Sequence, residues 1–323
     1  MVVFYLNLYM TKQHISHENI AIANLGGIDL SLSVTHVGNR KAQNKVLIIN
    51  NLHGNELTGF YVLEEALQSM PIVENGLLSI ISSANPLGLL HKQRFMPIDN
   101  VDLNRGYPPQ AKERGIQVVL KNTLLEIGSK YDVIIDLHTF VRPSLSAAMV
   151  VSQASEKNTE LIDDLSKTLG VEVVYKMNIH GSEEKRVASA FAFQMIAQGK
   201  AACVVEYSPI QYTSGSEVTQ FAQGLVRALS RCGLYDLPEV SQVKKEIPTF
   251  ERRQMMSRSS GLFLPKKALK EQVDKGEVLG YIIDVKTLEK KPLISEYSGV
   301  VTEIAAREFY VFGEKLVTIG VEQ

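Results

Sequence analysis

Residues 50–59, NNLHGNELTG, are the stretch from which the fold of this chain can first be predicted. They follow the apolar, β-branched run at residues 45–49, which is typical of a buried strand. They lead into residues 56–70, where apolar side chains recur at helical spacing. His53 and Glu56 therefore lie where a strand ends and a helix begins. Open α/β sheets bind ligands at that edge.

Strand and helix patterns alternate through the first two thirds of the chain. Further strands are predicted at residues 29–37, 77–84, 131–138, 145–151, 171–175 and 201–206, and helices at 111–127, 156–169, 186–197 and 216–230. Residues 29–37 alternate as a half-buried edge strand does. We therefore predict an α/β domain over residues 1–237, with a mostly parallel mixed sheet and helices on both faces. Residues 91–110 are predicted to form one long loop, a feature that is usually functional or mobile.

The pattern changes after residue 237. Residues 238–256 are polar and are predicted to be a linker, and residues 257–323 carry short strand candidates without helical periodicity. Residues 273–280 and 298–301 are similar to biotinyl- and lipoyl-type sandwich domains, but the chain has no Met-Lys-Met sequence for attaching a carried group. We therefore expect a small all-β, barrel-like accessory domain beside the active site.

The composition restricts the kinds of partner. Of 323 residues, 45% are hydrophobic and 21% are charged, and the net charge of -1 disfavours nucleic acid as a partner. Cys203 and Cys232 form no metal-type pair and are too few for a disulfide scaffold. The apolar residues 1–10 lack the basic region and cleavage site of a secretory signal, and no stretch reaches the roughly 20 apolar residues of a membrane span. We predict a cytoplasmic protein without a membrane partner, and a homo-oligomer stays open.

Polar residues follow three of the predicted strands. These are His53 with Glu56, then His138, and then Glu206. If the strands are neighbours, all four side chains meet at one edge of the sheet. Zinc accepts imidazole nitrogen and carboxylate oxygen at about 2.0–2.2 Å, and two histidines with one carboxylate leave a position for water. Glu206 would then be the base that takes a proton from the water and delivers it to a leaving amine.

The long loop supplies Arg94, Asn104 and Arg105. Arginine holds a carboxylate through paired hydrogen bonds and also stabilises a developing oxyanion, so the loop could provide both substrate anchor and electrophile. Two alternatives stay open here. Arg105 could instead pair with Asp102, and Asp136 could either orient His138 or be structural.

In this order, HGNE at 53–56, Asn85-Pro86, Arg94, DLNR at 102–105, DLH at 136–138 and Glu206 resemble the succinylglutamate desuccinylase/aspartoacylase family. This family is a branch of the zinc carboxypeptidase-like hydrolases. The likeness runs from about residue 45 to residue 209.

The resemblance implies one zinc ion per chain, with His53, Glu56 and His138 as its ligands and Glu206 as the general acid/base. It implies further roles for residues that contact the substrate: Arg94 would polarise the scissile carbonyl, Asn104 and Arg105 would hold a carboxylate, and Tyr310 would be a contact near the carboxyl terminus. Arg186 is the nearest match to a specificity arginine that the family carries before its catalytic glutamate.

Our first functional hypothesis is a zinc-dependent amidohydrolase that removes an acyl group from a small N-acyl amino acid. The alternatives are a metallocarboxypeptidase for short or modified peptides and a non-catalytic metal-binding protein of the same fold. Glu206 argues against the last, because metal binding alone needs no base. The chain has no Gly-x-Ser-x-Gly or reactive-cysteine motif for a nucleophilic mechanism.

Overall fold

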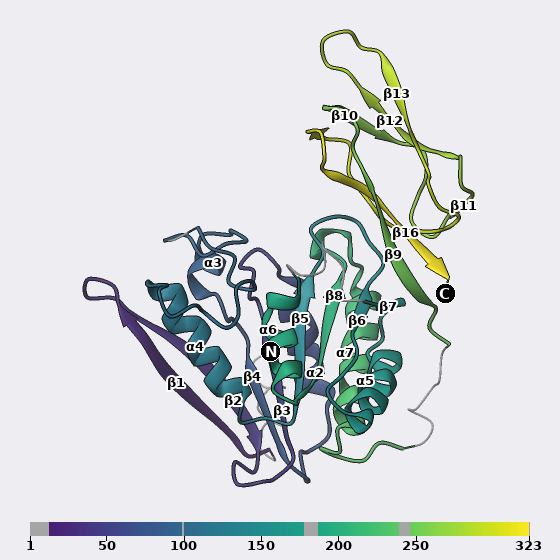
Figure 1. The fold of residues 1–323 in the computed structure, drawn as a ribbon. Helices are drawn as coiled ribbons and strands as arrows, with labels where there is room; N and C mark the ends of the chain where they lie inside the picture. Colours follow the sequence, from purple (N-terminus) through teal and green to yellow (C-terminus); the bar gives the residue numbers. More distant parts are fainter. Residues whose placement is uncertain (1–12, 99, 178–186, 239–245, 323) are drawn as a thin grey trace, which may run out of the picture.

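The computed structural model describes residues 13–98, 100–177, 187–238 and 246–322, and Figure 1 shows their arrangement. The first part of the chain alternates strands and helices. Its strands are β1 (Ile15–Asn24), β2 (Asp29–Gly38), β3 (Lys45–Asn50), β4 (Leu77–Ile81), β5 (Val133–Thr139), β6 (Ala147–Val150), β7 (Val173–Lys176) and β8 (Ala201–Tyr207). Its helices are α2 (Thr58–Ser69), α3 (Pro86–Leu90), α4 (Ile116–Gly128), α5 (Glu156–Thr168), α6 (Phe191–Ala197) and α7 (Gly215–Arg231), with short 3-10 turns η1 (Val187–Ser189) and η2 (Ile210–Tyr212).

Helices cover both faces of the central sheet, as predicted. Along β3, Leu47 and Ile49 belong to a hydrophobic core that includes residues of α4 and α6. Val46 and Ile48 belong to a second core, which includes residues of α2, α5 and α7. Successive side chains of a strand point to opposite faces, so a continuous apolar run such as β3 needs cover on both sides. This explains why the run is unbroken by polar residues.

The prediction of a mostly parallel sheet is not confirmed, because many strands of the large sheet pair in antiparallel fashion. The large sheet has twelve strands in the order β1-β2-β4-β3-β5-β8-β6-β7-β9-β16-β14-β11. Its last four strands belong to the carboxyl-terminal part: β9 (Thr249–Met256), β16 (Lys315–Glu322), β14 (Gly299–Ile304) and β11 (Gln272–Val273). Pairing is parallel among β4, β3, β5 and β8 and along β6, β7 and β9. It is antiparallel for β1 with β2, β2 with β4 and β6 with β8, and beyond β9. Hairpin connections allow antiparallel pairs, whereas parallel neighbours need a crossover.

Residues 29–38 are also not an edge strand. β2 lies between β1 and β4, and β1 forms the edge of the sheet as one arm of a long hairpin (Figure 1). Most side chains of β1 are partly buried or exposed, so its sequence lacks the apolar alternation that predicts a strand. Its backbone pairing with β2 decides its conformation.

The predicted linker at 238–256 contains strand β9 (Thr249–Met256). β9 pairs with β7 in parallel and with β16 (Lys315–Glu322) in antiparallel fashion, so the large sheet continues into the carboxyl-terminal part (Figure 1). β9 buries Phe250 and Met255 and carries charged residues between them. Its sequence is therefore polar although its backbone is paired on both sides.

The rest of the carboxyl-terminal part is built of strands, as predicted. They are β10 (Gly261–Pro265), β11 (Gln272–Val273), β12 (Val278–Ile283), β13 (Lys290–Ile294), β14 (Gly299–Ile304) and β15 (Phe309–Tyr310). A second sheet has the order β13-β12-β10-β15, and a core that includes Phe263, Leu279 and Val301 supports it. The division at residues 237 and 257 stays a prediction. Among the described residues, no helix has both the length and the apolar character required to cross a membrane.

Candidate metal and active site

The strands that end in polar residues are neighbours in the sheet. β5 lies between β3 and β8, all three are parallel, and His138 is directly opposite Glu206. Parallel strands have their carboxyl ends at the same edge, so the residues that follow β3 lie next to His138 and Glu206. The structure therefore brings these strand-end residues together at one edge of the sheet, as the sequence predicts.

Local packing of residues 51–56 positions His53 and Glu56. The buried Asn51 side-chain amide donates to the backbone carbonyls of His53 (2.9 Å) and Glu56 (3.0 Å). Gly54 packs against the backbone of α3, where an added Cβ would lie 2.0 Å from the carbonyl carbon of Gly88. A side chain at residue 54 would therefore push the two segments apart, which explains the glycine between the histidine and the glutamate.

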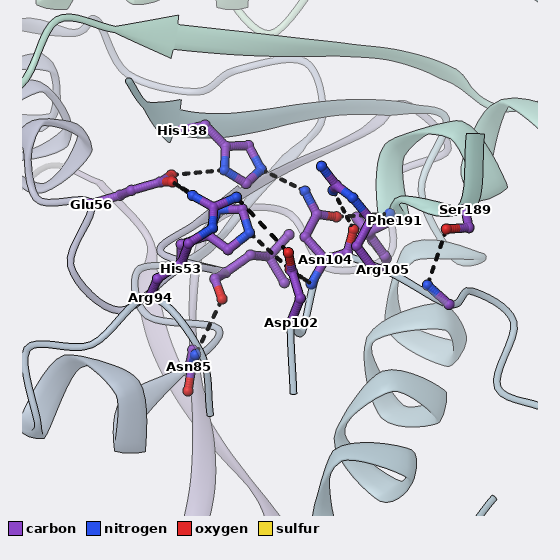
Figure 2. A network of polar contacts seen from close by, with 12 residues as sticks. His53, Glu56, Asn85, Arg94, Asp102, Asn104, Arg105, His138, Ser189 and Phe191 are labelled. Atoms are coloured by element: carbon purple, nitrogen blue, oxygen red, sulfur yellow. Dashed lines mark hydrogen bonds and ion pairs between the residues drawn. The ribbon is translucent and has the colours of Figure 1, made fainter. Parts of the chain in front are cut away.

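Figure 2 shows Glu56 facing two histidines. Glu56 Oε1 lies 2.7 Å from His53 Nδ1, and Glu56 Oε2 lies 2.8 Å from His138 Nδ1. The backbone N–H of Thr139 donates to Glu56 Oε2 at 3.0 Å. All three side chains are buried, and ligand atoms from each lie within 4.8 Å of one another. The cluster can therefore present two nitrogens and a carboxylate oxygen to one ion.

The far nitrogens of both imidazoles face further polar groups. His53 Nε2 lies 3.0 Å from Asp102 Oδ1, and His138 Nε2 lies 3.2 Å from Asp136 Oδ1 and 3.0 Å from Asn104 Nδ2. The contact with Asp136 lacks hydrogen-bond alignment, and both Asp136 oxygens are buried without a hydrogen bond. Carboxylates behind ligating histidines orient the ring and make it a better ligand.

Charges at the cluster shift the ionisation of its members. Burial alone would raise the pKa of Glu56, but the two histidines outweigh it and the pKa lies well below its ordinary value. Burial would also raise the pKa of Asp102, yet His53, Arg105 and Arg94 lower it far more. Arg94 Nη1 donates to Glu56 Oε1 at 2.9 Å. Both carboxylates are therefore ionised at neutral pH.

The donor set fits zinc. His53 Nδ1 is buried and has no hydrogen bond of good geometry, although it lies 2.7 Å from Glu56 Oε1. A buried nitrogen without a partner is costly, and a cation between His53, Glu56 and His138 would satisfy it. Two imidazole nitrogens and one carboxylate oxygen are also a ligand set of catalytic zinc sites.

A cavity of about 110 Å³ adjoins the cluster. Its polar lining is His53, Arg94, Asn104, Arg105, His138, Glu206 and Arg252, and its apolar lining is Met149, Met177, Ala190, Phe193 and Val204. Burial raises the pKa of Glu206 by more than the neighbouring His138 lowers it. A carboxylate with a raised pKa is suited to exchanging protons near neutral pH.

The structure brings most of the predicted site residues to this cavity, including Arg94, Asn104 and Arg105. Asn104 is held from two sides, since its Oδ1 accepts from the backbone N–H of Phe191 at 2.9 Å while its Nδ2 faces His138. Arg105 Nη1 donates to the Asn104 carbonyl at 2.7 Å. Asp102 is the alternative partner for Arg105. Its side chain contacts His53 and Arg94.

One predicted residue among those that the structure describes is not brought there. Tyr310 is buried in the carboxyl-terminal core, where its ring packs edge-on against Phe263 and lies under the Arg142 guanidinium. Tyr310 does not line the cavity. Arg186 lies outside the described residues.

Sequence reasoning missed two residues of the site. Asp102 was considered only as a partner of Arg105, and its contact with His53 depends on the folding of the long loop. Arg252 lines the cavity from β9, inside the segment predicted to be a linker. Arg252 follows the buried Phe250 by two residues, and side chains two residues apart in a strand point to the same face of the sheet. This spacing is the signal in the sequence that could have placed Arg252 beside the site.

The fold and the site define an α/β protein with a candidate metal cluster at the carboxyl edge of its sheet. The model of the succinylglutamate desuccinylase/aspartoacylase catalytic domain matches residues 42–232, more than half of the chain. The chain therefore belongs to the succinylglutamate desuccinylase/aspartoacylase family, as the sequence resemblance indicated. The names of the family's members describe deacylating hydrolases.

Solved structures share the fold over nearly the whole chain. A succinylglutamate desuccinylase/aspartoacylase from Rhodobacter sphaeroides is 18% identical with a TM-score of 0.79, covering 96% of this chain and 95% of its own. The product-bound ectoine utilization protein EutE from Ruegeria pomeroyi is 16% identical with a TM-score of 0.82, covering 95% of both chains. An aspartoacylase family protein from Mesorhizobium loti is 20% identical with a TM-score of 0.75, covering 96% of both. No curated protein matches the sequence.

Proposed function

We propose that this protein is a zinc-dependent amidohydrolase that removes an acyl group from a small N-acyl amino acid. The observation that carries the proposal is the convergence of His53, Glu56 and His138 beside a cavity that also contains Glu206. Family membership and the product-bound form of the related ectoine utilization protein support a small-molecule substrate.

His53 Nδ1, Glu56 and His138 Nδ1 would hold the zinc ion. When bound, zinc supplies a Lewis acid that lowers the pKa of water and polarises the amide carbonyl. Asp102 and Asp136, behind the two imidazoles, would keep their rings oriented toward the ion. The chain's own residues would perform the remaining steps.

Glu206 would act as general base and then as general acid. It lies opposite His138 on the neighbouring strand and lines the cavity, so a substrate amide at the cluster would be within its reach. It would take a proton from the attacking water and pass it to the amine nitrogen as the C–N bond breaks. Its raised pKa makes the protonated form accessible for the second step.

The arginines would position the substrate. Arg94 donates to Glu56 and lines the cavity, and it would donate to the carbonyl oxygen as negative charge develops there. Arg105, with Asn104 beside it, would hold the amino-acid carboxylate through charge-assisted hydrogen bonds. The contact proposed for Tyr310 receives no support from its burial in the other core.

The test is metal content by elemental analysis together with hydrolysis of a panel of N-acyl amino acids. We expect His53→Ala and His138→Ala to lose zinc and activity. Glu206→Gln should keep zinc and lose about 10²- to 10⁴-fold in kcat, because only the proton transfers are removed. His17→Ala, an exposed histidine on β1, is the matched control and should change neither quantity.

Wild-type protein that binds no zinc would refute the proposed metal site. Zinc-loaded wild-type protein that cleaves peptides with free carboxyl termini, but no N-acyl amino acid, would favour the metallocarboxypeptidase alternative. A zinc-loaded protein inactive on both panels would favour the non-catalytic one.

A further inference from the structure

We propose that Arg252 is a specificity-determining residue that recognises a second carboxylate on the substrate. This inference rests on the proposed function, because it takes the cavity to be the substrate site. The residues predicted from the sequence provide no partner for this second carboxylate, and strand β9 would supply one through Arg252.

The sheet register places Arg252 on the same face as the catalytic candidates. Phe250 on β9 lies opposite Tyr175, Tyr175 opposite Met149, and Met149 opposite Val204. Val204 lies two residues before Glu206 on β8, so all of these side chains share one face. Arg252 follows Phe250 by two residues and shares that face, from which it reaches the cavity.

The charges around Arg252 do not cancel. Its guanidinium Nη2 donates to Glu303 Oε2 at 2.9 Å, and Lys315 Nζ donates to the same oxygen at 2.6 Å. Two cations thus share the buried Glu303 carboxylate, which can neutralise only one of them. The Nε atom of Arg252 is buried and has no hydrogen-bond partner among the described residues. The guanidinium therefore has a donor left for a ligand.

Apolar side chains also line the cavity that Arg252 reaches. Met149, Met177, Phe193 and Val204 offer contacts to methylene groups but no hydrogen bonds. The cavity accordingly suits an amide with a short aliphatic chain that ends in a carboxylate. That carboxylate can belong either to the acyl group or to the amino-acid side chain, and the chemistry recognised by Arg252 is the same.

The experiment compares ligands that differ only in the second charge. One arm uses N-succinyl-alanine against its neutral amide, N-succinamyl-alanine, and the other uses N-acetyl-glutamate against N-acetyl-glutamine. For zinc-loaded wild-type protein, we expect the charged member of at least one pair to have the higher kcat/KM. The arm that shows the preference identifies which end of the substrate carries the carboxylate.

Substitution of Arg252 should remove this preference selectively. Arg252→Gln should lower kcat/KM for the preferred charged substrate about 10- to 100-fold, as expected for a lost charge-assisted hydrogen bond, and change the neutral partner by less than about threefold. Arg252→Lys, which keeps the charge without the planar fork, should retain part of the preference. Glu303 keeps Lys315 and Thr318 as partners in these variants, which supports folding.

Arg253→Gln is the matched control. Arg253 points to the opposite face of β9, where it pairs with Glu251 at 2.7 Å and lies over the Tyr297 ring. It does not line the cavity, so this variant should behave as wild type. If Arg252→Gln lowered kcat/KM equally for the charged and the neutral substrate of a pair, the inference would be overturned, because an equal loss indicates a structural role only.

Binding separates failure of this inference from failure of the proposed function. Calorimetric titration of zinc-loaded Glu206→Gln protein with the same four compounds should show tighter binding of a charged member, and Arg252→Gln in that background should abolish the difference. This result would support the role of Arg252 even if wild-type protein hydrolysed none of the compounds. No preference for a charged member in binding would overturn it.

Discussion

Glu56 is the residue on which the candidate metal site depends. Each of its carboxylate oxygens faces a different histidine, and both Arg94 and the Thr139 backbone also donate to it. The Nε2 nitrogen of each imidazole, on the side away from Glu56, faces an oxygen of a different carboxylate. For His53 that oxygen belongs to Asp102, in the long loop, at 3.0 Å from Nε2. The geometry of the site therefore extends beyond its three candidate ligands.

The substitution Asp102→Ala tests whether the contact between Asp102 and His53 contributes to metal binding. Without the acceptor at Nε2, the His53 ring loses its orientation, and we expect zinc affinity to fall about 10- to 100-fold. Titration against a competing chelator measures the change. Asp29→Ala, which changes an exposed residue at the start of β2, is the control. Unaltered zinc affinity in Asp102→Ala would show that the loop contributes nothing to the metal site.

At the scale of elements, the site depends on helices that fit closely against the sheet and against one another. Helix α7 packs against both α2 and α5 on the face opposite the cavity. At Gly224 the two backbones approach closely, since an added Cβ would lie 2.2 Å from the Leu169 carbonyl carbon and oxygen at the end of α5. A glycine inside a long helix costs helix propensity, so its presence reflects this contact.

Gly224→Ala should therefore destabilise the protein although alanine is the better helix former. We expect a loss of about 1–3 kcal/mol in the free energy of unfolding, because the backbones of α5 and α7 must move apart. Gly215→Ala, in the first turn of the same helix with no atom within 4 Å of its added Cβ, should stay within about 1 kcal/mol of wild type. Urea denaturation followed by circular dichroism compares the two. Equal stability of both variants would contradict the argument from close packing.

At the scale of the whole molecule, the carboxyl-terminal part is joined to the α/β part by backbone and by charge. β9 extends the sheet from β7, and the Leu145 N–H donates to the Thr302 carbonyl at 2.8 Å. Glu303, on β14, is buried beside this junction and accepts from Arg252 on β9 and Lys315 on β16. One carboxylate thus ties three strands together next to the cavity.

The junction should make stability sensitive to acid. Burial would raise the pKa of Glu303, but Lys315 and Arg252 outweigh it, so the folded pKa lies below the ordinary value of 4.5. The stabilisation from the ionised carboxylate is then present above about pH 4.5 and is lost as the pH falls through the lowered pKa. Glu303→Gln should cost about 3–5 kcal/mol at neutral pH, since it leaves two partly buried cations without a counter-charge, and should remove this part of the acid dependence.

Urea unfolding at pH 7 and in mild acid measures both effects of Glu303→Gln. Glu296→Gln is the control, because Glu296 pairs with Arg258 on the exposed surface, where an ion pair contributes about 0–1 kcal/mol. A loss no larger than in the control would mean that Glu303 does not stabilise the junction.

The candidate ligands could be predicted because each is encoded locally. His53 and Glu56 follow an apolar strand by a few residues, and His138 and Glu206 end two more such strands. The chain pattern therefore identifies them as strand-end residues, and the strand order then brings them to one edge. The parallel sheet was overpredicted because strand patterns carry no direction. The polar sequence of residues 249–256 predicts a linker, because their charged side chains conceal a strand that is paired on both sides.

The sequence by itself determined the α/β core, the family and the set of residues that could bind a metal, because short-range patterns of apolar and polar residues decide which side chains follow each strand. Only the tertiary structure decided that Asp102 backs His53, that Arg252 reaches the cavity and that Tyr310 does not. These placements depend on contacts between segments far apart in the chain. Their pairing is decided by packing and charge across the whole sheet, and no local pattern records it.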